Sequence, residues 1–209
     1  MKLIHKSEEP KFFSDWKGQV SKAKRYIWKY FQDPDKQNLH QSIMEEQGYL
    51  CCYCGQRIDE KKSHIEHVRP RSKFPKQTFE YGNMLASCLS NTAPKAPRHC
   101  GVLKDNWYDE ELFISPLQPD CEEHFRFLAN GEIRPRTEND KAAETTIDKL
   151  GLNIPKLKNM RKGAIAGLPS SDLTSDEIKE LTVAHSSRDK DGAFTDFCHV
   201  LVYHLQHNY

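Results

Sequence analysis

Four cysteines in the first half of the chain have the spacing of a metal site. Cys51 and Cys54 form a C-x-x-C pair, and Cys88 and Cys100 follow with eleven residues between them. The backbone turn of C-x-x-C directs two sulfurs to one point, and four thiolates make a closed tetrahedral zinc site. The sequence therefore predicts a structural zinc ion bound by these four cysteines, with His99 as an alternative ligand.

A redox pair and unliganded core thiols are the alternatives to zinc. A thioredoxin-like pair needs a strand–helix–strand context, which the residues around 51–54 do not offer. The chain has seven cysteines, an odd number that a full disulfide framework would not leave, and disulfides are rare in a reducing compartment. Cys52, Cys121 and Cys198 do not fit the metal spacing, so we expect them in the core or at the surface.

The segment "SHIEHV", residues 63–68, brackets a glutamate with two histidines. It does not match the H-E-x-x-H motif of zinc proteases. Its residues predict a short strand that Pro70 ends. Phosphodiester hydrolysis would use such a group, because a divalent ion must neutralise the phosphate and a base must take a proton from water. A carboxylate can hold the ion, and a neutral imidazole, with its pKa near working pH, can be the base.

The stretches "CCYCG", "HIEHVRPRS", "GNMLASC" and "HCGVLK" together resemble the HNH endonuclease motif, a ββα-metal nuclease with an added zinc knuckle. The resemblance implies that His67 is the general base that activates water and that Glu66 ligates the catalytic ion. It also implies that Asn83 braces the loop and orients the base. Neighbouring residues of a strand face opposite sides, so Glu66 and His67 can share a site only if the strand ends or bulges there.

The chain departs from this family pattern directly after Cys100, the last cysteine of the predicted knuckle. Family members with two C-x-x-C pairs have asparagine there, followed three residues later by lysine, whereas this chain has Gly101 and Lys104. The second protein ligand of the catalytic ion is therefore open, and the ion itself is expected to be Mg²⁺ or Mn²⁺. The candidates for that ligand are, in order, His64, His99 and Asn91.

A wider pattern narrows the resemblance. Together with the motifs above, "EEQGYLCCYCGQRI", "FRFLANGEIRP" and "LGLNIPKLKNMR" are similar to the HNH nuclease subunits of Septu-type anti-phage defence systems, which are also found beside retrons. The similarity spans roughly residues 37–162. It implies an ABC-type ATPase as a partner, the bacterial cytoplasm as the location, and a role in halting phage infection.

The net charge of +1 hides an uneven distribution. Residues 51–104 carry ten Lys and Arg against four Asp and Glu, whereas residues 105–209 carry twelve against nineteen. The basic segment fits a polyanion, and the acidic half fits a protein partner better than nucleic acid. We expect little base specificity, since phosphate contacts carry no sequence information. The expected substrate is DNA rather than RNA. The expected phosphate contacts are Arg69, Arg71, Lys73, Lys76 and Lys104.

The predicted fold class is α+β, with a ββα-metal HNH nuclease core and zinc knuckle flanked by helical N- and C-terminal regions. The expected segments are 1–48 (helical), 49–108 (zinc-stabilised nuclease core) and 109–209 (α+β, binding a partner). No apolar run is long enough to span a membrane, and the start of the chain lacks the apolar core of a secretion signal. The alternative function is a non-catalytic zinc scaffold that docks nucleic acid or a protein.

Four local expectations can be compared with the structure. "NMLASCL", residues 83–89, is expected to begin a helix. Asn130-Gly131 supplies a tight turn between two β-like runs and predicts a hairpin. Thr174 with Glu177 predicts a capped helix start. Arg161 is expected on a solvated helix face.

Overall fold

The computed structural model describes residues 1–22, 27–89, 96–169 and 173–207. The chain folds into helices and small antiparallel sheets, so the predicted α+β class is confirmed. The α-helices are α1 (Lys11–Lys22), α2 (Asp35–Glu46), α3 (Cys100–Lys104), α4 (Lys141–Lys149), α5 (Pro155–Ala166), α6 (Ser175–Ser186) and α7 (Cys198–His207). The short 3₁₀ helices are η1 (Trp28–Tyr30), η2 (Glu60–Lys62), η3 (Pro75–Gln77) and η4 (Tyr81–Asn83).

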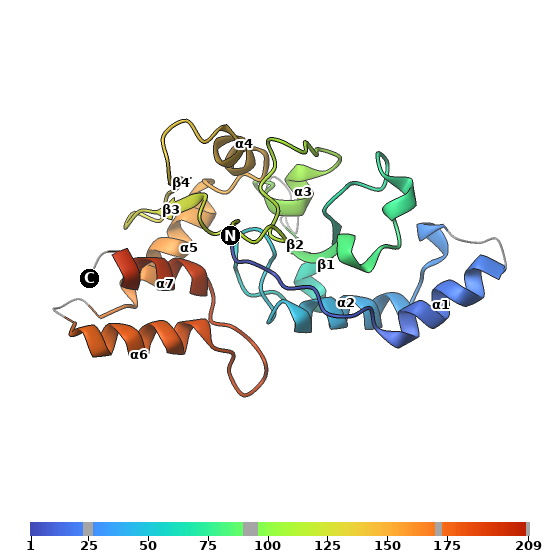
Figure 1. The fold of residues 1–209 in the computed structure, drawn as a ribbon, viewed down its shortest axis with the longest axis horizontal. Helices are drawn as coiled ribbons and strands as arrows, with labels where there is room; N and C mark the ends of the chain where they lie inside the picture. Colours follow the sequence, from blue (N-terminus) through green and yellow to red (C-terminus); the bar gives the residue numbers. More distant parts are fainter. Residues whose placement is uncertain (23–26, 90–95, 170–172, 208–209) are drawn as a thin grey trace.

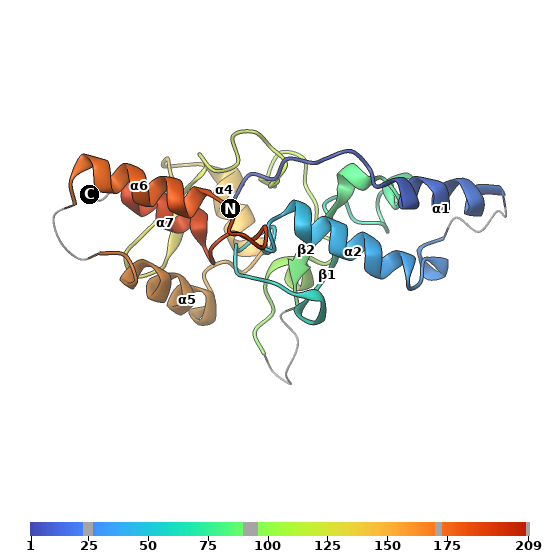
Figure 2. The same cartoon turned by 90° about the horizontal axis from the view of Figure 1, so that it is seen from below.

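The molecule is long rather than spherical. Figure 1 shows α1 at one end, α6 and α7 at the other, and the first hairpin between them. Figure 2 shows the same order from a second direction, with α6 and α7 lying side by side. Among the described residues, no helix is both long and apolar enough to cross a lipid bilayer.

The central hairpin consists of β1 (Ser63–His67) and β2 (Met84–Cys88), which pair antiparallel. The strand predicted for residues 63–68 is confirmed, and it ends at His67. The helix expected to begin in residues 83–89 is wrong, because those residues form η4 and β2. All five residues of β2 are buried, so the strand has no solvent-exposed face. A short, mainly apolar run of this kind does not distinguish a strand from a helix.

Helices α2 and α3 both contact β2. The side chain of Gln47, just after α2, donates to the carbonyl oxygens of Leu50 and Ala86 and accepts from the backbone nitrogen of Ala86. These buried hydrogen bonds attach the start of the cysteine knuckle to β2. The knuckle and the hairpin are therefore one rigid unit.

The C-terminal half bears out two of the local predictions. Strands β3 (Phe125–Phe127) and β4 (Ile133–Pro135) form the predicted hairpin, with Gly131 at φ +81°. Thr174 and Glu177 form the predicted capping box of α6. The expectation for Arg161 is wrong: it is 1% exposed, and its guanidinium donates to the carbonyl oxygens of Gly131 and Leu152. These carbonyls form a buried acceptor site that helical periodicity could not reveal.

One main cluster of buried side chains draws on residues from Met1 to Val200. The three segments predicted from the sequence therefore contribute to a shared core. A smaller cluster joins Leu168 to Leu201 and Leu205 of α7. It packs against partly buried residues of α6, which places α6 outside the main core.

Candidate functional site

The four predicted zinc ligands meet in one place. The sulfurs of Cys51, Cys54, Cys88 and Cys100 all lie within 4.8 Å of one another, and each residue is 0–3% exposed. The Cys54 and Cys88 sulfurs are 3.9 Å apart. A tetrahedral zinc with bonds of about 2.3 Å places its sulfurs about 3.8 Å apart, so the cluster has the right size and donor type for zinc.

The surroundings of the cysteine cluster favour a bound cation. Burial raises the pKa of the Cys100 thiol well above its usual range, whereas Cys51, despite its burial, has its pKa lowered well below that range by hydrogen bonds with the neighbouring thiols. The Cys51 sulfur accepts a hydrogen bond from the backbone nitrogen of Cys88 at 3.4 Å, of the kind that orients metal ligands. His99 Nδ1 lies 3.2 Å from the Cys100 sulfur and 3.6 Å from that of Cys88. His99 thus stands at the cysteine cluster.

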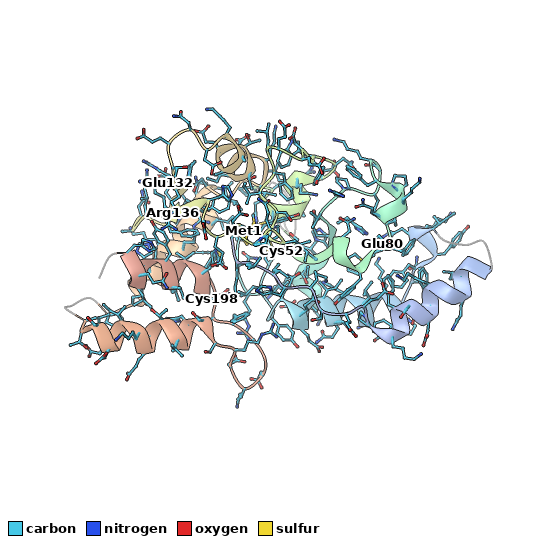
Figure 3. All side chains as sticks on the ribbon, in the orientation of Figure 1. Met1, Cys52, Glu80, Glu132, Arg136 and Cys198 are labelled. Atoms are coloured by element: carbon cyan, nitrogen blue, oxygen red, sulfur yellow. The ribbon has the colours of Figure 1, made fainter. Side chains whose placement is uncertain are left out.

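The remaining cysteines lie outside this cluster, as expected. Cys52, Cys121 and Cys198 are buried free thiols. Cys52 lines a cavity of about 490 Å³ together with Met1, and Figure 3 labels both near the middle of the molecule. Nothing else in that cavity joins Cys52 in a metal-binding group among the described residues.

The two carboxylate oxygens of Glu66 have different contacts. Oε1 accepts hydrogen bonds from the Tyr53 hydroxyl at 3.1 Å and from the Lys104 ammonium at 2.9 Å. Oε2 faces His64 Nε2 at 3.3 Å. Burial raises the pKa of this carboxyl, but the contacts with His64 and Lys104 outweigh it and lower the pKa below its usual value. Glu66 is therefore a buried carboxylate with one oxygen held by Tyr53 and Lys104 and the other facing His64.

Gly101 leaves the space beside that oxygen open. A Cβ added to Gly101 would lie 2.5 Å from Glu66 Oε2 and 3.0 Å from His64 Nε2. The residue that replaces the family's asparagine therefore points at the predicted ion site but contributes no side chain. Carboxylate and imidazole are suitable donors for a divalent ion. Among the described residues, no third carboxylate, cysteine or histidine completes a group around this pair, and Asn91 lies outside those residues.

His67, the predicted base, is held on a separate set of contacts. Its Nε2 lies 3.0 Å from the carbonyl oxygen of Thr78, and because a carbonyl only accepts, Nε2 carries the proton and Nδ1 keeps its lone pair. Burial lowers the pKa of His67 to about 4, with a further decrease from the Arg71 charge and a partial increase from the Thr78 contact. The Trp28 ring packs edge to face against the imidazole, with the two ring centres 4.8 Å apart. The imidazole is thus neutral near pH 7, and its contacts with Thr78 and Trp28 hold the ring in place.

Asn83 braces the loop that follows β1. Its Oδ1 accepts from the backbone nitrogen of Arg69 at 2.8 Å, and its Nδ2 donates to the carbonyl oxygens of Arg69 and Gln77 at 3.0 and 3.2 Å. Gln77 precedes Thr78, the acceptor of His67. The side chain of Asn83 therefore fixes both ends of the loop that carries the contact of the predicted base.

The predicted phosphate contacts divide into exposed and buried residues. Arg71, Lys73 and Lys76 are exposed. Arg69 is partly exposed and donates to the Tyr108 hydroxyl and to Glu110. Lys104 requires a correction: its side chain is 0% exposed and its ammonium bridges Glu66 to the carbonyl oxygen of His67. It balances the buried carboxylate and does not reach a phosphate at the surface.

Three contacts of the site escaped the sequence motifs. Tyr53 lies between two of the predicted zinc ligands in the sequence, Thr78 acts through its backbone, and Trp28 comes from a segment outside the predicted nuclease core. The only signal for Tyr53 in the sequence is its position between Cys52 and Cys54. A backbone acceptor and a distant aromatic leave no pattern in a sequence.

Two curated proteins resemble this chain. It is 36% identical over 129 residues to "Retron Vc95 putative HNH endonuclease" of Vibrio cholerae serotype O1 biovar El Tor, a match covering 58% of this chain and 60% of the relative. It is 26% identical over 204 residues to "Retron Ec83 putative HNH endonuclease" of Escherichia coli, covering 78% of each. The first match spans less than two thirds of that relative's length. No protein-family model matches the chain. The resemblance to retron-associated HNH endonucleases is thereby confirmed.

Proposed function

We propose that this protein is a metal-dependent HNH endonuclease that hydrolyses nucleic-acid phosphodiester bonds on a zinc-stabilised ββα-metal core. One observation carries the proposal: the last two residues of β1 are a buried carboxylate and a buried neutral imidazole, and each keeps one acceptor atom outside the contacts with Tyr53, Lys104 and Thr78 that fix it. For Glu66 that atom is Oε2, which faces His64 Nε2 and Gly101, and for His67 it is Nδ1, because Nε2 donates to Thr78. Both residues are in register with β2, Glu66 opposite Leu85 and His67 opposite Met84, and the strand ends directly after them, so a substrate at this end of the strand would have to reach both.

His67 acts as the general base in this proposal. Its Nδ1 lone pair takes a proton from the attacking water, and the hydrogen bond from Nε2 to Thr78 keeps the ring in the tautomer that can do so. A pKa of about 4 lies below the value near working pH that was expected for the base, and it keeps the imidazole unprotonated at neutral pH. Asn83 serves this role indirectly, because its three hydrogen bonds hold the loop that carries Thr78.

Glu66 and His64 would hold the divalent ion. When bound, Mg²⁺ or Mn²⁺ would neutralise the phosphate and stabilise the leaving oxygen. Mg²⁺ is commonly bound through one or two carboxylates and keeps water and substrate phosphate as its other ligands, so two protein donors suffice. Tyr53 and Lys104 orient Glu66 so that Oε2 points at the space beside Gly101. His99 is the less suitable candidate, because it stands at the cysteine cluster.

We further propose that the protein is the effector subunit of a bacterial anti-phage defence complex with an ABC-type ATPase, in the cytoplasm. Two observations support this. The relatives are named as retron endonucleases, and residues 105–209 carry seven more acidic than basic residues, nineteen against twelve. A surface of this charge fits a protein partner better than nucleic acid.

The alternative is a zinc scaffold that binds nucleic acid or a partner without cutting. Gly101 is the observation in its favour, because the asparagine of the resembling family is missing at a position that faces Glu66 and His64. A scaffold has no need of His67 as a base. Replacing that histidine therefore separates the two functions.

The experiment is cleavage of supercoiled plasmid and of total RNA in Mg²⁺ and in Mn²⁺, with and without the ATPase encoded alongside. His67→Ala is compared with wild type and with the matched control His5→Ala, which removes an exposed imidazole. We expect wild type and the control to cut and His67→Ala to be about 10²- to 10⁴-fold slower, the usual contribution of a general base. Equal inertness of all three proteins beside the partner would favour the scaffold, and equal cutting would exclude His67 as the base.

A further inference from the structure

A surface beside the proposed base combines aromatic rings with positive charge. The 3₁₀ helix η1 (Trp28–Tyr30) has no buried residue, and Tyr30 is 49% exposed. The Trp28 ring touches the His67 ring at 4.8 Å, and the Arg71 guanidinium lies 4.8 Å from the centre of the same Trp28 ring. We call Trp28 and Arg71, together with the exposed Tyr30 two residues further along η1, the aromatic platform. Its two aromatic residues belong to the N-terminal helical region, which the HNH resemblance does not explain.

The platform is fixed from below. Trp28 packs against Phe31 and Phe79, with ring centres 5.5 and 5.7 Å apart. Both phenylalanines are fully buried, at 0% and 1% exposure. Trp28 itself is partly exposed. The ring is therefore held in place by the core on one side, while part of it remains available to a ligand without prior ordering.

The charge around the platform suits a nucleic-acid backbone. Residues 69–76 carry four basic residues and no carboxylate. Within the described part of the chain, no ion pair involves the exposed Arg71, Lys73 or Lys76. Lys36 adds a further ammonium 5.9 Å from the Trp28 ring. Unpaired cations grouped around aromatic rings are the usual combination for single-stranded nucleic acid.

An aromatic platform is of little use on an intact double helix. In a duplex the faces of each base are covered by its neighbours, whereas unpaired bases can stack on aromatic rings or on a guanidinium plane. We propose that the platform binds an unpaired base next to the bond that His67 attacks, so that the substrate is nucleic acid with unpaired nucleotides at the cut. The position of the base next to a cleaved bond rests on the proposed nuclease function, whereas the binding of unpaired bases does not.

Binding is measured without cleavage, in the His67→Ala background and without divalent ions. The probes are a labelled 20-mer of oligo(dT), a 20-mer of oligo(U) and a blunt DNA hairpin duplex with the same number of phosphates. We expect the two single strands to bind more tightly than the duplex and to quench tryptophan fluorescence. The dT and U arms show whether DNA or RNA is preferred.

Trp28→Ala and Tyr30→Ala should each weaken single-strand binding by about five- to 150-fold, the range given by loss of a base–aromatic stack of about 1–3 kcal/mol. Duplex binding should change less than twofold. Trp28→Phe keeps a stacking ring, so it should restore affinity relative to Trp28→Ala and remove most of the quenching. Val183→Ala is the matched control, because Val183 is a large apolar residue, 64% exposed, on α6.

Two results would overturn the platform: duplex bound as tightly as single strands by the parent protein, or equal losses on both ligands in the variants. A loss of folding is recognised by thermal unfolding, and Tyr30→Ala guards against it, because Tyr30 is exposed. If wild-type protein cuts duplex freely while single strands do not bind, the platform fails and the nuclease stands. If single strands bind at the platform but nothing is cut, the nuclease fails and the platform stands.

Discussion

The cysteine cluster and the Glu66–His64 site are neighbours on one hairpin, yet they differ in almost every property. The first has four identical soft donors within 4.8 Å of one another, all buried. The second has two hard or borderline donors 3.3 Å apart, with the His64 side chain 31% exposed. Residues 100 and 101, adjacent in sequence, belong one to each site. Cys100 supplies a ligand, whereas Gly101 supplies space.

The difference follows the division between structural and catalytic metal sites. A structural site is closed because every coordination position is filled by protein, and a catalytic site keeps positions open for water and substrate. The cysteine cluster has no room for a substrate, and the Glu66–His64 pair cannot saturate an ion without one. With both proposed ions bound, a short module would use one metal for its fold and present the other to its substrate, provided that the two donor sets stay separate.

The largest effect is expected on removing the structural metal. Structural zinc contributes roughly 10–16 kcal/mol of apparent binding free energy, as much as the whole stability of a typical domain. Cys88→Ser should therefore lose bound zinc and unfold the hairpin region, as measured by elemental analysis and circular dichroism. Cys121→Ala, a buried cysteine outside the cluster, should keep its zinc. An unchanged melting temperature for Cys88→Ser would show that the cluster is not structural.

The second effect tests the clamp on Glu66. Lys104→Met removes the ammonium and leaves a buried carboxylate without its partner, which should cost about 3–5 kcal/mol of unfolding free energy. Adding Glu66→Gln should recover part of that loss, because the uncompensated charge disappears. Lys141→Met is the control, since the exposed Lys141–Glu144 pair should be worth less than about 1 kcal/mol. Chemical denaturation of the four proteins distinguishes these cases, and equal losses for both lysines would contradict the buried clamp.

The third prediction concerns pH. The pKa of His67 is about 4 in the folded protein and about 6.5 when unfolded. Between these values the unfolded state binds a proton that the folded state does not, so stability should rise as pH increases from 4 to 6.5 and then level off. At about pH 4, protonation of His67 in the unfolded state lowers the free energy of unfolding by about 3 kcal/mol relative to neutral pH. Urea unfolding at pH 5 and pH 7 should show a smaller difference in His67→Gln than in wild type, and an equal difference would assign the dependence to other groups.

The smallest effect sharpens the contrast between Cys100 and its neighbour. Gly101→Ala places a methyl group 2.5 Å from Glu66 Oε2, and overpacking of this kind costs about 1–3 kcal/mol. Cleavage should fall more than stability does, because the methyl group occupies the space proposed for the ion. Gly163→Ala in α5 meets nothing within 4 Å and should be neutral or slightly stabilising. If Gly101→Ala cuts at the wild-type rate, the ion does not bind beside Gly101.

Local chemistry made part of this structure predictable. The C-x-x-C spacing, the turn-forming Asn130-Gly131 and the Thr174–Glu177 pair depend on residues within a few positions, and the structure has the corresponding knuckle, hairpin and helix cap. The predictions that were wrong concern burial. A strand buried on both faces resembled the start of a helix, and a basic helical residue, Arg161, was expected in solvent.

The sequence alone therefore determined the donor chemistry of this protein: four thiolates, a carboxylate and the imidazoles near it. The tertiary structure decided what each polar group is for. Lys104 pairs with Glu66 across 38 positions of sequence, and Trp28 reaches His67 from a separate helical region. The physical reason is that charge balance and stacking depend on distance in space and on exclusion of water. Neither quantity is set until distant segments pack together.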